Sequence, residues 1–361
     1  MAKQLKNLLN VDFIAGLSKK LRETDPHFNT AGFQKAVFSI DWKAMELKAR
    51  IRHVAIVMGK FLPYPYPAQI KILLKVAPEI GGLGGLVFPE FVEEFGLEDP
   101  ITSLNALEIL TCYSSGEFAI RPFVRKYPDE TLGRIKIWTK HSNEHVRRLC
   151  SEGIRPRLPW SSPLQEFKKD PAPVLEILEH LKNDPSEYVR RSVANNLNDI
   201  AKDHPAFVLK TAQRWIGKSA ASDKLLKHAC RTLLKQGNSE ALKIFGFKKG
   251  ANASVKNLRA PKNKLRIGER LPFSFELHNE SRSVKQLRVE YIVYFLKNNG
   301  SHAKKIFQLS SKKFNPGKTI LKRSHSFKDF TTRKHYPGEH HLAIAVNGVE
   351  KIKMKFVVHR L

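Results

Sequence analysis

The first 250 residues carry apolar stripes of helical periodicity separated by short polar breaks. Apolar residues recur every three or four positions, which is typical of amphipathic α-helices. Asp-Pro steps, as at Asp99 and Asp170, and glycines such as Gly217 mark where these segments stop, because Pro and Gly disfavour continued helix. The pattern predicts helices over 11–22, 43–61, 67–78, 101–114, 117–127, 129–140, 144–152, 171–182, 186–202, 205–216 and 222–236.

From residue 251 onward the periodicity changes from helical to alternating, which is typical of half-buried strands. The alternating runs are LPFSFELHN, LRVEYIVYFL, KKIFQLS, ILKRSHSF, HHLAIAVNG and EKIKMKFVVH, separated by turn pairs such as Asn299-Gly300 and Asn347-Gly348. Strands at this spacing predict an immunoglobulin-like β-sandwich, here without any cysteine for an inter-sheet disulfide. The preceding stretch ANASVKNLRAPKNK is either a linker or a first edge strand. We therefore expect a helical domain over 1–250 and a β-sandwich domain over 251–361.

An internal repeat specifies how the helices are arranged. Residues 145–152 align with 188–195 at a spacing of 43, and both segments carry a Val-Arg-Arg pattern near the start of a predicted helix. A period of this length is typical of HEAT-type repeats, which stack helix pairs so that equivalent helices line one concave surface. The sequence therefore predicts an α-solenoid of HEAT-like helical repeats followed by a small immunoglobulin-like β-sandwich.

The charge of the chain indicates a polyanionic partner. The sequence contains 63 Lys and Arg against 34 Asp and Glu, a net charge of +29, and an excess of this size favours binding to phosphates. No apolar run approaches the roughly 18 residues of a membrane-spanning helix, and the first residues do not resemble a signal peptide. Three scattered cysteines suit a reducing compartment. We expect a monomer that binds nucleic acid in the cytoplasm and has no membrane partner.

The predicted β-sandwich domain is the more basic of the two domains. Residues 251–361 hold 24 Lys and Arg against 7 Asp and Glu, a net charge of +17. Several of these cations come in pairs near predicted turns or strand ends, where a sandwich presents loops to a partner. The pairs are Lys304-Lys305, Lys312-Lys313, Lys322-Arg323 and Arg333-Lys334. We expect this domain to contact DNA.

Two acidic residues recur in a similar local context. Glu117 precedes Ile-Arg121-Pro, and Glu152 precedes Ile-Arg155-Pro, at a separation of 35 residues. Carboxylates on a DNA-facing surface repel phosphate, so they are useful there only if they meet positive charge, such as a cationic base or an oxocarbenium-like sugar. The alternative is that each glutamate forms an ion pair with its own arginine at helical spacing.

Three segments resemble the AlkC branch of the AlkC/AlkD superfamily, bacterial DNA glycosylases built from HEAT-like repeats. They are SSGEFAIRPFV at 114–124, RRLCSEGIRPRLPWSS at 147–162 and YVRRSVANNLNDIAKDHP at 188–205. The resemblance implies a monofunctional glycosylase that excises cationic N-alkylated bases, chiefly 3-methyladenine and also 3-methylcytosine, during base excision repair. It implies no metal and no cofactor. Part of the AlkC branch also carries a C-terminal immunoglobulin-like domain.

The resemblance also implies which residues form the site. Glu117 and Glu152 match the acidic positions of the family, and Asp199 is a further candidate carboxylate unless it only caps its helix. Trp160 is expected to stack on the lesion or deoxyribose. Trp138 is a second candidate, with burial in the core as its alternative. The residues expected to contact DNA are Arg121, Arg148, Arg155, Arg157, Arg191 and Asn195.

A non-enzymatic HEAT-repeat scaffold that binds nucleic acid is the alternative function. The recurring glutamates distinguish the two, because a protein that only binds DNA gains nothing from two acids on its basic surface. The expected partner is double-stranded DNA that carries alkylated bases, which would associate the protein with the bacterial nucleoid.

Overall fold

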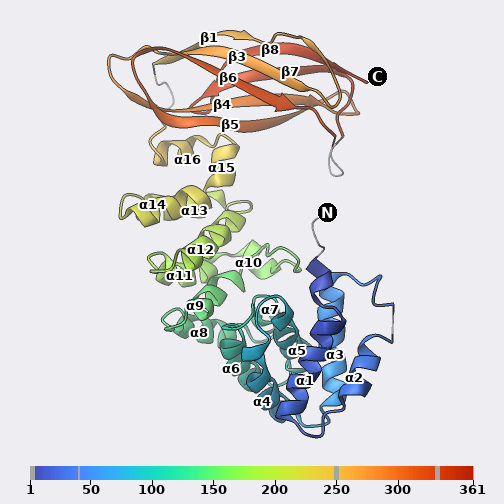
Figure 1. Cartoon of the computed structure of the whole chain (residues 1–361). Coiled ribbons are helices and arrows are strands. Elements are labelled where there is room, and N and C mark those ends of the chain that lie inside the picture. The colour runs from blue at the N-terminus through green and yellow to red at the C-terminus, as the bar shows by residue number, and fades with distance from the viewer. Residues whose placement is uncertain (1–4, 40, 248–251, 330–333, 361) are drawn as a thin grey trace. The chain divides into compact units, whose positions relative to one another are not determined.

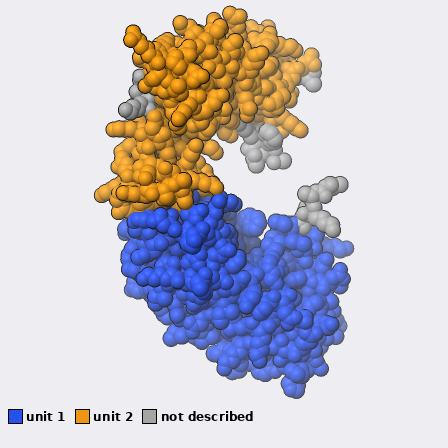
Figure 2. Space-filling model, turned by 60° about the vertical axis from the view of Figure 1, so that its left-hand side comes forward, with its two compact units in different colours: residues 1–204 blue, residues 205–361 orange. Residues whose placement is uncertain are grey.

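The computed structural model describes residues 5–39, 41–247, 252–329 and 334–360. The chain divides into two compact units, Met1–His204 and Pro205–Leu361 (Figure 2). The predicted boundary at 250/251 separates helices from strands, whereas the boundary between compact units lies at 204/205. The last helices therefore belong with the strands in the second unit.

The first unit consists of helices that pack on their neighbours in succession (Figure 1). Near the middle of the series, α9 packs against α8, α11 and α12. This stacking of helix pairs confirms the predicted α-solenoid. The helices are α1 Val11–Thr24, α2 Thr30–Val37, α3 Leu47–Phe61, α4 Tyr66–Val76, α5 Val87–Phe95, α6 Pro100–Leu110, α7 Ile120–Lys126, α8 Pro128–Trp138, α9 Glu144–Glu152, α10 Gln165–Lys169, α11 Ala172–Leu181 and α12 Glu187–Ile200, with 3₁₀ turns η1 Leu5–Leu8, η2 Ala77–Glu79 and η3 Gly84–Leu86.

Side-chain caps explain several helix starts. Asn10, Asn29, Asp99 and Asn143 each accept a hydrogen bond from a backbone N–H of the first turn, which would otherwise have no partner within its helix. The cap at Asn143 fixes the start of α9, the helix that ends at Glu152.

In the first unit, helices α2, α5 and α10 are absent from the sequence prediction, and the helices predicted over 43–61 and 117–127 begin too early. Helix α5 is only nine residues long and contains Pro89, and a short apolar run of this kind cannot be assigned to a helix by periodicity alone. The helix predicted over 117–127 begins only at Ile120, so Glu117 lies in the loop before α7.

The first arginine of each Val-Arg-Arg pattern holds the turns between helices. Arg147 binds Asp184 through Nε at 2.7 Å and Nη2 at 3.0 Å, and its Nη1 donates to the carbonyls of His141 and Ser142. Arg190 donates in the same way to the carbonyl of Asp184 and to that of the following proline. The repeated arginine is therefore a structural element of the solenoid.

The second unit begins with four helices and continues with eight strands among the described residues. The segment predicted as one helix over 222–236 is broken at Cys230. The helices are α13 Pro205–Trp215, α14 Ala220–Ala229, α15 Arg231–Lys235 and α16 Ser239–Ile244, and the strands are β1 Ala253–Arg259, β2 Lys264–Arg266, β3 Arg270–Asn279, β4 Lys285–Leu296, β5 His302–Phe314, β6 Gly317–Ser326, β7 Gly338–Val346 and β8 Val349–His359.

The strands form two sheets, in the orders β1-β3-β6 and β2-β8-β7-β4-β5 (Figure 1). Apolar side chains of both sheets, including Phe275 and Phe356, share one buried core. This arrangement confirms the predicted β-sandwich and makes β1 an edge strand. Arg288 in β4 pairs with buried Glu290 at 2.7 Å and also contacts the carbonyl of Leu234 in α15, which joins helix to sheet within the unit.

No helix in the described part of the chain is both long enough and apolar enough to cross a membrane.

We predict that Arg147→Ala lowers the free energy of unfolding by about 3 kcal/mol, because it leaves the buried Asp184 carboxylate without its partner. Arg191→Ala is the matched control, since its side chain is 67% exposed, and should change the stability by less than about 0.5 kcal/mol. Urea denaturation followed by circular dichroism measures both values. Equal stability of the two variants would contradict the structural role of Arg147.

Candidate active site

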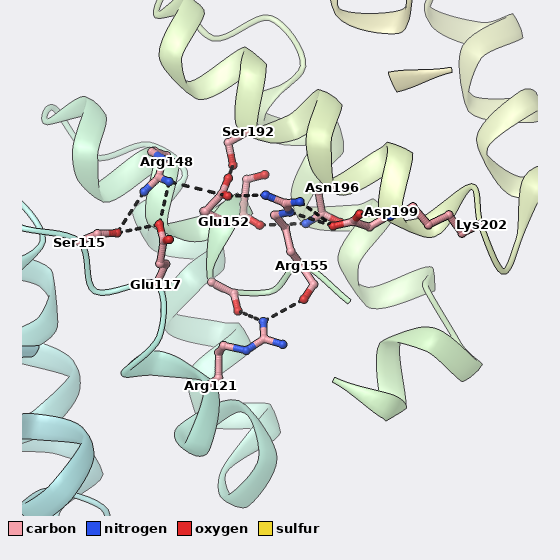
Figure 3. Close-up of polar contacts among 12 residues, drawn as sticks. Ser115, Glu117, Arg121, Arg148, Glu152, Arg155, Ser192, Asn196, Asp199 and Lys202 are labelled. Carbon is pink, nitrogen blue, oxygen red and sulfur yellow. Dashed lines mark hydrogen bonds and ion pairs between the residues drawn. The ribbon is translucent and has the colours of Figure 1, made fainter. Parts of the chain in front are cut away.

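Three carboxylates from separate helix ends meet in the first unit (Figure 3). Glu117 lies in the loop before α7, Glu152 is the last residue of α9, and Asp199 lies in the last turn of α12. The packing of α9 against α12 brings the second and third together, although they are 47 positions apart in the sequence. The stacking of repeats therefore assembles the cluster.

Arginines separate the carboxylates in an alternating series, which we call the charge chain: Glu117, Arg148, Glu152, Arg155 and Asp199. Arg148 Nη2 lies 2.7 Å from Glu117 Oε2 and 3.7 Å from Glu152 Oε1. Arg155 lies 2.6 Å from Glu152 Oε1 through Nη1 and 2.8 Å from Asp199 Oδ2 through Nη2 (Figure 3). Each arginine thus bridges two acids.

The acids hold both arginines strongly in their charged form. Burial alone would lower the pKa of Arg148, but attraction by Glu117 and Glu152 outweighs it, and the pKa is raised. The pKa of Arg155 is raised for the same reason, because Glu152 and Asp199 attract its guanidinium against the cost of desolvation. The charge chain is therefore a set of fixed charges in a poorly hydrated setting, where electrostatic effects are larger than in water.

The three carboxylates differ in how fully they are bonded. Glu152 accepts from Arg155 on Oε1 and from Ser192 Oγ on Oε2 at 2.6 Å. Asp199 accepts from Arg155 on Oδ2 and from Lys202 on Oδ1 at 3.0 Å.

Glu117 is the most exposed of the three carboxylates, and it is bonded through one oxygen. Ser115 and Arg148 both contact its Oε2, at 2.8 and 2.7 Å, while Oε1 has no partner among the described residues. This oxygen is available to accept a proton from water.

One of the two ion pairs expected from sequence spacing forms and the other does not. Arg155 pairs with Glu152, three residues before it. Glu117 instead pairs with Arg148, from the next helical repeat. The recurring motif therefore produces two different environments for its two glutamates.

Arg121 does not fit its expected role as a DNA contact. Its side chain is 1% exposed, and Nη1 donates to the carbonyls of Gly153 and Arg155 (Figure 3). Nη2 donates to the carbonyl of Ser162. Burial lowers its pKa to about 10, and the nearby Arg125 acts in the same direction. The residue supports the loop after α9 from inside, and that loop carries both Arg155 and Trp160.

The two candidate tryptophans lie in opposite environments. Trp160 is 64% exposed, as a stacking residue must be. Trp138 is 2% exposed and belongs to the helical core, so its expected role in stacking on a lesion is wrong and its alternative, a core position, is correct.

The other expected DNA contacts are distributed unevenly. Arg191 is exposed, with Glu187 3.5 Å away, whereas Arg148, at the equivalent repeat position, is largely buried between two glutamates. Arg157 forms a two-point contact with Asp203 at 3.1 and 2.6 Å. Asn195 is half-buried on α12. Arg191 is therefore better placed than Arg148 to meet a phosphate.

The sequence reasoning missed the polar residues that orient the acids. Ser115 precedes the Glu-Ile-Arg-Pro motif by two residues, but Ser192 and Lys202 reach the charge chain only through the packing of α12 on α9. Among the described residues, no cluster of His, Cys, Asp and Glu has an arrangement that would hold a metal ion.

The fold and the site define a HEAT-like-repeat protein with an immunoglobulin-like domain and a cluster of three carboxylates that are paired with arginines. The chain matches the family model for the C-terminal Ig-like domain of the uncharacterised protein YhaZ over residues 254–360. It is 41% identical to the uncharacterized protein YhaZ of Bacillus subtilis, covering 98% of this chain and 99% of the relative.

A solved structure also matches the whole chain. The alkylpurine DNA glycosylase AlkC of Pseudomonas fluorescens, bound to DNA containing an abasic site analog, is 35% identical, with a TM-score of 0.93 and 99% of each chain covered. The protein belongs to the AlkC family, in the form that carries a C-terminal immunoglobulin-like domain.

We predict that Arg121→Met destabilises the fold by about 3 kcal/mol, because two buried carbonyls lose their charged donor. The salt dependence of DNA binding should stay unchanged. Lys126→Met, an exposed position on the same helix, should alter stability by less than about 1 kcal/mol. Chemical denaturation and DNA titrations at several salt concentrations test both statements. A flatter salt dependence in a stable Arg121→Met protein would restore the DNA-contact role.

Proposed function

We propose that this protein is a monofunctional DNA glycosylase that removes cationic N-alkylated bases, such as 3-methyladenine and 3-methylcytosine, in base excision repair. The observation that carries the proposal is the charge chain with its one open carboxylate oxygen, Glu117 Oε1. The whole-chain likeness to the alkylpurine DNA glycosylase AlkC supports it. The enzyme is expected to act as a monomer, without metal or cofactor, on double-stranded DNA in the cytoplasm and nucleoid.

The chemistry follows from the charge of the lesion. An N3-alkylated adenine or cytosine already carries a positive charge, so the bond between N and C1′ breaks without protonation and its electron pair neutralises the base. The sugar becomes oxocarbenium-like, and nearby carboxylates stabilise it electrostatically. A water oxygen then bonds to C1′, and its proton passes to a carboxylate acting as general base.

The bonding pattern assigns different tasks to the carboxylates. Glu117 is proposed as the general base, because Oε1 is unbonded while Ser115 and Arg148 orient the other oxygen. Glu152 and Asp199 have both oxygens occupied, so they are proposed to stabilise the developing positive charge and to hold Arg155 in place.

Trp160 and the exposed cations are proposed to position the DNA. The exposed indole of Trp160 would stack on the lesion or deoxyribose next to the charge chain. Arg191 is proposed to hold a phosphate. Arg157 and Asn195, which lie in the segments that resemble the AlkC branch, are proposed as secondary contacts with the DNA. Arg148 and Arg155 are proposed to hold the carboxylates rather than the DNA, because each of them already forms ion pairs with two acids.

The direct test is incubation of the protein with methylated duplex DNA followed by chromatography of the released bases. Release of 3-methyladenine with an intact phosphate backbone supports the proposal. If the protein binds the duplex and releases no base, the non-enzymatic scaffold replaces it.

We predict that Glu117→Gln and Glu152→Gln each reduce the single-turnover excision rate by about 10²–10³-fold, the usual loss when one charge-stabilising group is removed. Affinity for undamaged DNA should stay equal or rise slightly, because a negative charge near phosphate is removed. Glu130→Gln, at an exposed position in α8, should keep the wild-type rate. Near-wild-type excision by both site variants would mean that these carboxylates are structural.

The immunoglobulin-like domain is proposed to contact DNA as well. Its net charge of +17 is far from that of an ordinary domain of its size, and Lys304, Lys305, Lys312 and Lys313 are all exposed on β5. Arg333, of the pair Arg333-Lys334, lies outside the described residues. Contact from a second domain would raise the effective concentration of the duplex at the first.

We predict that replacing Lys304 and Lys305 by Ala weakens binding to every duplex alike. The slope of log K against log salt should fall by about one to two units, since each lost phosphate contact removes about 0.9. Arg191→Ala should lower the slope by about one unit. An unchanged slope in the double variant, with its circular dichroism spectrum intact, would contradict a DNA-binding role for β5.

A further inference from the structure

The backbone at Trp160 adopts a conformation that its side chain disfavours. Its φ is +62°, in the left-handed region that residues other than glycine and asparagine seldom occupy. Its indole is nevertheless 64% exposed, so burial of the ring does not compensate. A contact from elsewhere in the fold must favour this conformation.

That contact comes from α3. The ammonium of Lys48 donates to the carbonyl oxygen of Trp160 at 3.3 Å, across 112 positions of sequence. It also lies 4.4 Å from the ring centroid of Phe118, the residue that follows Glu117. One cation therefore touches both loops of the candidate active site, the loop of the stacking residue and the loop of the proposed base.

The contacts of Lys48 belong to a small, largely apolar pocket. Lys48, Ser115, Phe118 and Trp160 line it together with Glu90 from α5. Phe118 and Lys48 are half-buried, and the ammonium lies against the carbonyl and the face of the ring.

Acids on α5 favour a cation at this place. Burial raises the pKa of Glu90 to about 7, repulsion by Glu93 acts in the same direction, and the cations Lys48 and Arg52 oppose both. Arg52 is itself paired with Glu94 and lies 3.9 Å from Glu90. Arg52 is therefore engaged by the acids of α5, whereas Lys48 contacts the two active-site loops.

We propose that Lys48 is a positioning residue that holds Trp160 in its exposed, stacking-ready conformation and joins it to the loop of Glu117. This rests on the proposed function, in which Trp160 stacks on the lesion. Lys48 acts through Trp160 and does not itself touch the reacting atoms. An arginine keeps the charge and the donors and should substitute in part, whereas methionine keeps only the hydrocarbon stem.

The test measures single-turnover excision of 3-methyladenine by full-length Lys48→Met, Lys48→Arg, Trp160→Ala and the Lys48→Met/Trp160→Ala double variant. We expect Lys48→Met to lose about tenfold in rate, comparable with one charge-assisted hydrogen bond, and Lys48→Arg to recover most of it. Once Trp160 is absent, Lys48→Met should cost little more. Lys60→Met, at an exposed position near the end of α3, is the matched control and should behave as wild type.

Two further readouts separate positioning from other roles. The salt dependence of DNA binding should not change in Lys48→Met, since a flatter slope would make Lys48 a phosphate contact and overturn the proposal. Acrylamide quenching of Trp160 fluorescence in the protein alone, taken as the difference from the Trp160→Phe variant, should change when Lys48 becomes methionine.

The outcomes also distinguish this proposal from the proposed function. A wild-type rate for Lys48→Met, or fully additive losses in the double variant, would overturn the positioning role. An unaffected rate for Trp160→Ala would instead remove the stacking role of Trp160, and the quenching experiment would still decide whether Lys48 holds that residue.

Discussion

The site depends on one electrostatic constraint: carboxylates gather in a poorly hydrated place only if cations lie between them. Each guanidinium in the charge chain has two acids as neighbours, and removing either one would leave buried like charges facing each other. The geometry of the acids is therefore set by Arg148 and Arg155. Because the guanidinium is planar and rigid, it fixes directions as well as charge, which lysine would not do.

The helical repeats supply the precision that this constraint needs. Arg147 fixes the turn before α9 and Arg190 the turn before α12, and α9 then packs on α12 so that Ser192 meets Glu152. Arg121 performs the corresponding task for the irregular loop after α9, by binding its carbonyls from inside. Repeated arginines in this chain are thus divided between the scaffold and the site, although they look alike in the sequence.

The sequence predicted what depends on local pattern and failed where tertiary packing decides. The alternating runs correctly predicted the β-sandwich, and the Glu-Ile-Arg-Pro repetition identified two glutamates that do lie together. Helix α5 was not predicted because it is a short apolar run that contains a proline. The equivalent arginines Arg148 and Arg191 differ in their partners, because the neighbouring repeat places Glu117 beside Arg148, whereas Arg191 meets Glu187 of its own helix. No local sequence pattern predicts the contact of Lys48 with Trp160, because the two residues are 112 positions apart.

Under the proposed function, the same electrostatics also explain selectivity for damaged bases. Along the charge chain and Lys202 three acids meet three cations, so the site as a whole neither attracts nor repels phosphate strongly. Negative charge is in excess only locally, at the open Oε1 of Glu117, where it favours a positively charged group. A neutral base leaving an intact nucleotide would require a proton from an acid. A lesion that is already cationic needs no such proton. Selectivity then arises in the bond-breaking step, from the leaving group itself, rather than from a pocket that recognises the shape of each base.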